Sequence, residues 1–325
     1  MAANHQLYPI KFKPILKEKV WGGSKLKELF KKNEGEKIGE SWEISGVDKN
    51  ISQIANGALK GKTLDWLLEN YKGKLVGEKI YREFGNKFPL LFKFIDAQED
   101  LSVQVHPDDL LAKKLHNSFG KTEMWYILDV EKDGRIILGF EENVGKQKYL
   151  NSLSEKEITE ILKSEPVKNG DAFLLKPGTV HAIGAGIVLA EIQQTSDITY
   201  RIYDWDRPDT NGQMRELHTD LALKAIDFNP PNAKLEYTEK MNSPISICAT
   251  HFFSVNKLVL SEDFNRDFSS INSFKVYMCI EGSATIETTD FSEEIKKGET
   301  ILIPAQLPEI KFTTNSASFL EVFIP

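Results

Sequence analysis

The sequence contains few cysteines and no excess of positive charge. Only two of its 325 residues are cysteines, Cys248 and Cys279, and both have apolar neighbours. Thiols in such settings are typical of buried core positions, so the sequence predicts neither a disulfide nor a cysteine metal site. The net charge of −7 argues against general nucleic-acid binding, which depends on a basic surface.

The sequence also lacks long hydrophobic runs. No apolar segment approaches the roughly 20 residues that a membrane helix requires, and the N-terminus has no apolar stretch of the secretory type. We therefore expect a cytoplasmic protein with neither a membrane nor a nucleic acid as partner. A monomer is the simplest expectation for its oligomeric state. A chain of this length is long enough for two domains.

Short segments between turn residues, several of them alternating apolar and polar, predict a mainly β protein. The predicted strands are 90–95, 101–106, 123–130, 135–140, 172–176, 187–193, 198–203, 252–260, 274–280, 284–288, 300–303 and 319–324. Helices are expected only at the periphery. They are predicted to follow Thr63, Pro107 and a capping box at Ser154 and Glu157, and to cover residues 217–226.

Four side chains form a candidate metal site. Gln104 and His106 are two positions apart on a predicted strand, so both face the same side. Glu123 begins another strand, and His181 follows a Pro-Gly-Thr-Val turn. The two nitrogens and two oxygens of this set are typical zinc ligands. The sequence therefore predicts one zinc ion per chain, with manganese and cobalt as open alternatives.

One segment recurs with different chemistry. Residues 169–178 and 297–305 both contain a glycine turn, an acidic residue, an apolar strand and then a proline, but a histidine follows only the first copy. We interpret the repeat as two similar β units, only one of which binds metal. The predicted domains are a catalytic metal-binding domain over residues 1–240 and a β domain without metal ligands over residues 241–325. Residues 227–240 are expected to form a linker.

The motifs around the predicted ligands resemble those of the type I phosphomannose isomerases. The matching segments are 101–108 (LSVQVHPD), 121–126 (KTEMWY), 178–182 (GTVHA) and 190–204 (AEIQQTSDITYRIYD). The resemblance extends from about Pro9 to the C-terminus, and it is to the compact bacterial form. It implies a duplicated cupin fold, which is a double-stranded β-helix or jelly roll, with a few peripheral helices. It also implies that the four ligands hold zinc, and that mannose 6-phosphate and fructose 6-phosphate are interconverted.

The resemblance implies roles for further residues. Arg201 matches a catalytic arginine of the family, and Lys121, Glu191, Asp197 and Ser102 match positions that line the same pocket.

A further segment, GESWEIS over residues 39–45, is similar to a family segment near the pocket. Its Trp42 is expected either to contact substrate at the pocket wall or to pack in the core.

An aldose–ketose isomerase moves a proton between adjacent carbons through an enediol or enediolate. It needs an acid/base, a cation for the oxyanion and a clamp for the phosphate. We expect Arg201 to stabilise the oxyanion or hold phosphate, with a structural ion pair to Asp197 or Asp204 as the alternative. Lys121 is expected to hold phosphate or an enediolate oxygen. Glu191 is the favoured proton-transfer group, with Lys121 and a metal-held hydroxide as alternatives.

Two other functions are compatible with part of this pattern. A cupin dioxygenase usually has two histidines and a carboxylate with open positions for oxygen, and Gln104, Arg201 and Lys121 argue against it. A sugar-binding protein without turnover is the other alternative. The complete ligand set beside a charged pocket argues against that reading.

Overall fold

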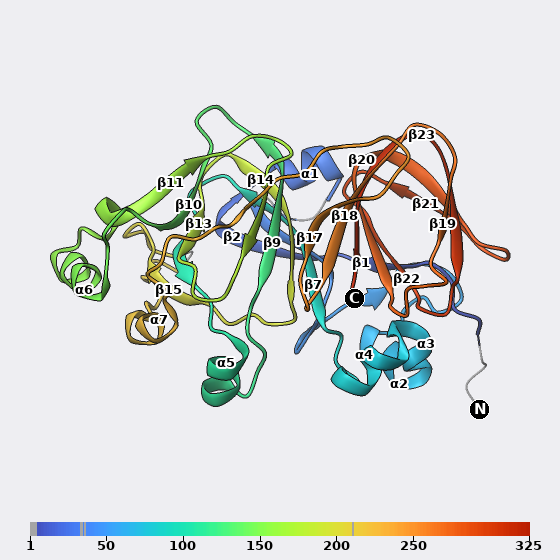
Figure 1. Cartoon of the computed structure of the whole chain (residues 1–325), viewed down its shortest axis with the longest axis horizontal. Helices are drawn as coiled ribbons and strands as arrows, with labels where there is room; N and C mark the ends of the chain where they lie inside the picture. Colours follow the sequence, from blue (N-terminus) through green and yellow to red (C-terminus); the bar gives the residue numbers. More distant parts are fainter. Residues whose placement is uncertain (1–4, 33–34, 36, 210) are drawn as a thin grey trace.

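The computed structural model describes residues 5–32, 35, 37–209 and 211–325. Two β units lie side by side along the long axis of the molecule, with helices at one end, below both units and, at the top, between them (Figure 1). The ladders between the named strands are antiparallel, and the sheets are open at their edges. The predicted mainly β architecture with peripheral helices is confirmed.

The first unit consists of two sheets packed face to face. The larger sheet has the order β16 (Lys234–Leu235), β12 (Ala172–Leu175), β9 (Glu123–Val130), β14 (Ile187–Gln194), β7 (Leu90–Ala97), β2 (Ile15–Gly23), β3 (Ile38–Ile44). The smaller sheet has the order β11 (Leu162–Pro166), β10 (Arg135–Phe140), β13 (His181–Ile183), β8 (Val103–Val105), β15 (Tyr200–Tyr203). A buried cluster that includes Trp125 and Leu189 of the larger sheet and Leu138 of the smaller one fills the space between them.

The second unit is built around two long strands. Its main path has the order β17 (Ile245–Ala249), β18 (Ser254–Leu260), β23 (Glu309–Phe323), β20 (Lys275–Glu287), β22 (Thr300–Ile303), β1 (Ile10–Lys13), β6 (Gln53–Ile54). Strand β19 (Phe264–Asp267) pairs with β23, and β21 (Ser292–Lys296) pairs with β20. Strands β4 (Gly46–Val47) and β5 (Asn50–Ile51) form a separate hairpin.

The two units share a hydrophobic core. Its largest cluster joins Phe92 of β7 to Val276 of β20 and Leu320 of β23. Strands β1 and β6 come from the N-terminal part of the chain but lie in the sheet of the second unit. The boundary after residue 240 stays a prediction. Both cysteines are buried and unpaired, as predicted.

Three of the predicted helices are present. They are α2 (Leu64–Tyr71), α5 (Asp109–His116) and α7 (Thr219–Ala225). The Asp108 side chain caps α5 by accepting a hydrogen bond from the backbone N–H of Leu111. No helix of the described residues is long and apolar enough to cross a bilayer.

The predicted capping box at Ser154 is wrong. Ser154 lies in the last turn of α6 (Lys146–Glu155), where its hydroxyl donates to the carbonyl of Asn151, and a short 3-10 segment, η1 (Ile158–Ile161), follows. The sequence analysis also missed α1 (Lys25–Phe30), α3 (Gly73–Val76) and α4 (Glu78–Phe84). Helix α3 bonds to the second unit, since its Leu75 and Val76 carbonyls accept from the backbone N–H groups of Ala305 and Phe274.

Candidate active site

Three predicted metal ligands converge between the two sheets of the first unit. Glu123 is the first residue of β9, His181 is the first residue of β13, and His106 directly follows β8. Glu123 Oε1 lies 3.2 Å from His181 Nε2, and Glu123 Oε2 lies 3.5 Å from His106 Nε2. One ligand atom from each residue lies within 4.8 Å of the other two. Side chains from three strands are thus brought close enough to bind one ion.

The orientation of both imidazole rings suits metal binding. His106 Nδ1 lies 2.9 Å from the carbonyl oxygen of Ile198, and His181 Nδ1 lies 2.8 Å from that of Thr179. A carbonyl oxygen only accepts, so each Nδ1 carries the hydrogen and each Nε2 has a free lone pair. The two Nε2 atoms are buried without a hydrogen-bond partner among the described residues. These unpartnered nitrogens fit a metal ion.

Electrostatics support the same conclusion. Burial lowers the pKa of His181 to about 4 and lowers the pKa of His106 well below its usual value, so both rings are neutral at pH 7. Burial raises the pKa of Glu123 to about 7, despite the Lys121 ammonium 3.1 Å from its Oε2. A fully buried carboxylate of this kind is undercompensated, and a divalent cation would supply the missing charge.

Gln104 lies between His181 and Arg201. In the ladders of β8 it faces His181 of β13 on one side and Arg201 of β15 on the other. Its side chain lines the same cavity as Arg201. This position makes Gln104 the candidate for a fourth ligand.

A cavity of about 370 Å³ opens beside these residues. The predicted site residues on its wall are Trp42, Ser102, Gln104, Lys121, Glu191, Asp197 and Arg201. Its lining contains six basic and three acidic side chains, although the whole chain is acidic. A positive cavity in an acidic protein suits an anionic substrate.

The guanidinium of Arg201 is held by the backbone instead of by a carboxylate. Its Nη1 donates to the carbonyl of Glu216 at 2.7 Å, and its Nε is buried without a partner in the described part of the chain. Asp204 pairs with Arg207 and Arg215 instead. The alternative of a structural ion pair between Arg201 and Asp204 or Asp197 is therefore wrong for the described residues. Arg201 keeps donors for a ligand.

Lys93 is a cavity residue that the sequence analysis missed. Its Nζ lies 2.7 Å from Glu191 Oε1 and 2.7 Å from Gln193 Oε1. Burial alone would raise the pKa of Glu191, but the nearby Lys93 and Lys121 ammonium groups outweigh burial, and the pKa falls to about 2. A single lysine inside the apolar run Leu-Leu-Phe-Lys-Phe-Ile was the available signal.

Trp42 lines the cavity, although only 7% of the residue is exposed. The ammonium groups of Lys17 and Lys93 lie 5.1 and 5.3 Å from the centre of its ring. Its Nε1 donates to Glu40 Oε2 at 2.6 Å, which adds a further carboxylate that the sequence analysis missed. Trp42 is thus both a core residue and part of the wall.

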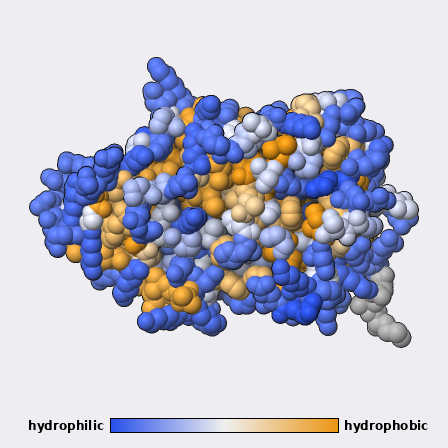
Figure 2. All heavy atoms as spheres, viewed as in Figure 1, coloured by the Kyte–Doolittle hydropathy of each residue, from blue (hydrophilic) through white to orange (hydrophobic). Residues whose placement is uncertain are grey.

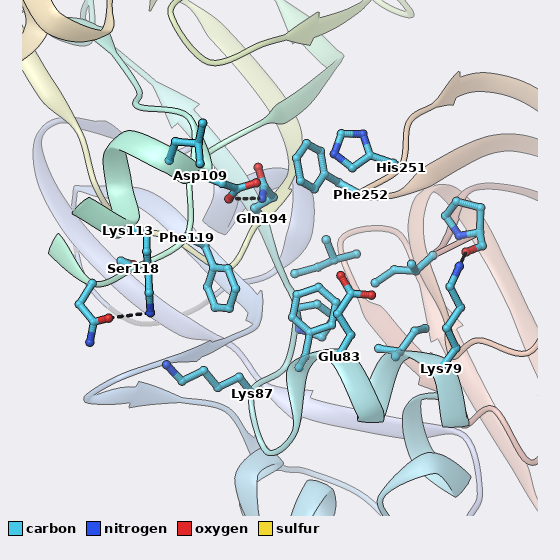
Figure 3. Close-up of a pocket in the computed structure, with 18 residues that line it drawn as sticks. Lys79, Glu83, Lys87, Asp109, Lys113, Ser118, Phe119, Gln194, His251 and Phe252 are labelled. Atoms are coloured by element: carbon cyan, nitrogen blue, oxygen red, sulfur yellow. Dashed lines mark hydrogen bonds between the residues drawn. The ribbon is translucent and has the colours of Figure 1, made fainter. Parts of the chain in front are cut away.

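A larger cavity of about 560 Å³ lies elsewhere, between α4, α5 and the second unit (Figure 3). Phe119 and Phe252 form part of its wall, and Gln194 Nε2 donates to Asp109 at its back. Leu110 of α5 also lines this cavity and is 82% exposed. Apolar residues gather on the surface around the position of α5 (Figure 2). His106, Glu123 and His181 line neither cavity, but Gln104 and Lys121, which lie next to this group, line the smaller one. The chemistry therefore belongs to the smaller cavity.

Two family models match the chain. The model of the phosphomannose isomerase type I catalytic domain matches residues 10–134, and that of the mannose-6-phosphate isomerase cupin domain matches residues 245–321. The cupin fold implied by the motifs is thereby confirmed.

The sequences of two named proteins align with nearly the whole chain. Mannose-6-phosphate isomerase ManA from Bacillus subtilis is 38% identical, with 93% of this chain and 95% of the relative covered. Mannose-6-phosphate isomerase from Streptococcus mutans is 32% identical over 94% of this chain and 95% of the relative.

The fold is also similar to those of solved structures. The crystal structure of the Bacillus subtilis mannose 6-phosphate isomerase superposes with a TM-score of 0.88 at 33% identity, covering 98% of this chain and 99% of that one. The apo enzyme from Salmonella typhimurium shares the fold, with a TM-score of 0.77 at 16% identity and coverage of 98% and 100%. Full-length similarity and the converging His–Glu–His group lead to the same conclusion: the chain belongs to the type I phosphomannose isomerase family.

Proposed function

We propose that this enzyme interconverts mannose 6-phosphate and fructose 6-phosphate through an enediol or enediolate, with one divalent ion bound per chain. The observation that carries the proposal is a positively charged cavity beside two unpartnered histidine nitrogens and a buried carboxylate. The positive lining suits a phosphosugar. In this proposal a bound ion would face the substrate oxygens on which negative charge develops.

Gln104, His106, Glu123 and His181 would hold the ion. This set has two neutral nitrogens, an amide oxygen and one carboxylate, which favours zinc. When bound, such an ion polarises substrate oxygens and stabilises an oxyanion. In this proposal the site belongs to the domain over residues 1–240, and residues 241–325 form a β domain without metal ligands.

Two positively charged side chains, Arg201 and Lys121, would act on the substrate. Arg201 would stabilise the oxyanion, because its guanidinium is half-buried and has no carboxylate partner in the described part of the chain. Lys121 would hold a second substrate oxygen from beside Glu123. Ser102, Asp197 and Trp42 would bind the sugar or its phosphate from the cavity wall.

The sequence favours Glu191 as the proton-transfer group, with Lys121 and a metal-held hydroxide as alternatives. Glu191 and Lys121 both line the cavity. Glu191 already accepts hydrogen bonds from Lys93 and Trp125, and these contacts bear on the choice between the two residues. A cytoplasmic location and a monomeric state remain predictions.

A coupled assay tests the function. The metal-loaded protein is incubated with mannose 6-phosphate, and fructose 6-phosphate is measured through a coupling enzyme. We expect turnover of the order of 1–1000 per second, which is the common range for enzymes. Binding of the phosphosugar without turnover would support the sugar-binding alternative, and oxygen consumption by an iron-loaded sample would support a dioxygenase.

A further inference from the structure

The two β units repeat the same order of strands. In the first unit the order is β12, β9, β14, β7, and in the second unit it is β22, β20, β23, β18. Strands β12 and β22 lie within the two copies of the sequence repeat. The match therefore extends from the repeat itself to three neighbouring strands. The register of the ladders shows which residue of the first unit corresponds to which residue of the second.

The register aligns Trp125 with Tyr277. Phe173 and Ile301 occupy the same position in the two copies of the repeat. Phe173 faces Trp125 across the β12–β9 ladder, and Ile301 faces Tyr277 across the β22–β20 ladder. Both partners are aromatic, both are fully buried and both carry a hydrogen-bond donor.

The next strand places a buried glutamate in both units. Glu191 of β14 faces Trp125, and Glu321 of β23 faces Tyr277. Trp125 Nε1 donates to Glu191 Oε2 at 2.9 Å, and the Tyr277 hydroxyl donates to Glu321 Oε2 at 2.5 Å. The same carboxylate therefore accepts from the same aromatic position in a unit that has the metal group and in one whose described residues lack it.

Each glutamate also bonds to a cation. Glu191 faces Lys93 of β7 and accepts from its Nζ at 2.7 Å. Glu321 faces Asn256 of β18, accepts from its amide at 2.7 Å and binds Arg266 through two contacts of 2.8 Å. Buried carboxylates are stable only when paired in this way. The duplicated feature is a carboxylate held between an aromatic donor and a cation.

The metal ligand itself differs between the units. Leu175 and Ile303 occupy the same position in the repeat, and they face Glu123 and Lys275 respectively. A lysine thus replaces the ligand carboxylate in the second unit. The exchange removes a metal ligand while the glutamate on the next strand is kept, so that glutamate is independent of the metal.

We propose that Glu191 is a positioning residue, which fixes the Lys93 ammonium at the cavity wall and packs Trp125 behind His181, and that it does not transfer the proton. Both of its oxygens already accept bonds from protein donors. Trp125 in turn lies edge-on to the ring of His181, with 5.3 Å between ring centres. The inference rests on the proposed function, since it assigns roles in that reaction.

Four proteins test the proposal: the wild type, Glu191→Gln, Lys93→Met and the double variant. A residue that acts through Lys93 has little further effect once Lys93 is gone. We expect kcat of the metal-loaded double variant to lie within about 3-fold of Lys93→Met. A general base contributes about 100-fold or more, so a double variant at least about 100-fold slower than Lys93→Met would overturn the proposal.

Urea unfolding of the metal-free proteins gives a readout other than activity. Lys93→Met leaves a buried carboxylate unpaired, and the double variant removes that charge. The double variant should therefore have a higher urea midpoint than Lys93→Met, and an equal or lower midpoint would contradict the pairing. This comparison does not need a substrate, so an inactive wild type would refute the proposed function alone. As a matched control, Glu321→Gln should lower the midpoint and leave kcat within about 2-fold, because it lies in the second unit.

Discussion

His106 and His181 lie with their ring centres 4.8 Å apart, and each ring donates its Nδ1 hydrogen to a backbone carbonyl. The backbone thus fixes the tautomer and the orientation of both rings before any ligand arrives. Preorganised rings bind an ion without a further loss of side-chain freedom.

Replacing His181 should remove metal and turnover together. In His181→Ala the pair of imidazole ligands is broken, and we expect metal affinity to fall by more than about 100-fold, since even residues outside the ligand set change affinity by 10- to 100-fold. Metal content after dialysis and kcat measure both effects. The matched control is His116→Ala, because His116 bonds to the Tyr200 hydroxyl and is not in the metal group. A His181→Ala protein that keeps its metal would contradict the ligand assignment.

Replacing Arg201 should separate metal binding from turnover. Arg201→Ala removes a guanidinium from the cavity wall but no proposed ligand, so the metal should stay bound. Removal of one oxyanion-stabilising group costs about 100- to 1000-fold in kcat. Arg135→Ala serves as the control, because Arg135 is partly exposed and pairs with Asp100, and neither residue lines the cavity. Unchanged kcat in Arg201→Ala would exclude this residue from the chemistry.

Metal affinity should depend on pH through Glu123. The pKa of this carboxyl in the metal-free protein is raised from 4.5 to about 7, mainly by burial. Below pH 7 the metal must displace a proton, so the affinity should fall about fivefold from pH 7 to pH 6 and change little above pH 8. The His181 pKa of about 4 keeps that ring neutral throughout this range. Competition with a metal indicator at pH 6, 7 and 8 measures the trend, and a flat profile between 6 and 7 would contradict it.

The same carboxylate should destabilise the metal-free protein. An acid whose pKa is raised on folding costs stability above its unfolded pKa, and the cost is complete above its folded pKa, here about 7. A shift from 4.5 to about 7 corresponds to about 3 kcal/mol. At pH 8 and without metal, Glu123→Gln should therefore be more stable than the wild type by about 1–3 kcal/mol. The lower value takes into account that the substitution also removes the carboxylate that pairs with Lys121. Urea unfolding with a chelator present measures the difference, and a less stable variant would be the opposite of the expected result.

The strands that position the site could be predicted from the sequence. Strands β9 and β10 have the predicted bounds, because their apolar runs end at clear turn residues. The ligands His106, Glu123 and His181 lie at the ends of strands. They could be predicted because the strand pattern gives their position and the residue types indicate metal binding.

Features that depend on distant contacts could not be predicted in the same way. Strand β2 contains alternating charges (Ile-Leu-Lys-Glu-Lys-Val) and is a strand because β3 and β7 pair with it. The predicted strands 274–280 and 284–288 are one strand, β20, since its ladder with β23 continues through bulges around Gly282. Lys93 and Glu191 are 98 positions apart, so the local sequence pattern around either residue does not predict that they pair.

The most direct test of the account is a metal titration of chelator-stripped protein. Zinc is added back in steps, and turnover of mannose 6-phosphate is measured at each step. The account predicts no turnover without metal and a linear rise that stops at one ion per chain. Full turnover in the stripped protein, or an endpoint other than one ion, would contradict it.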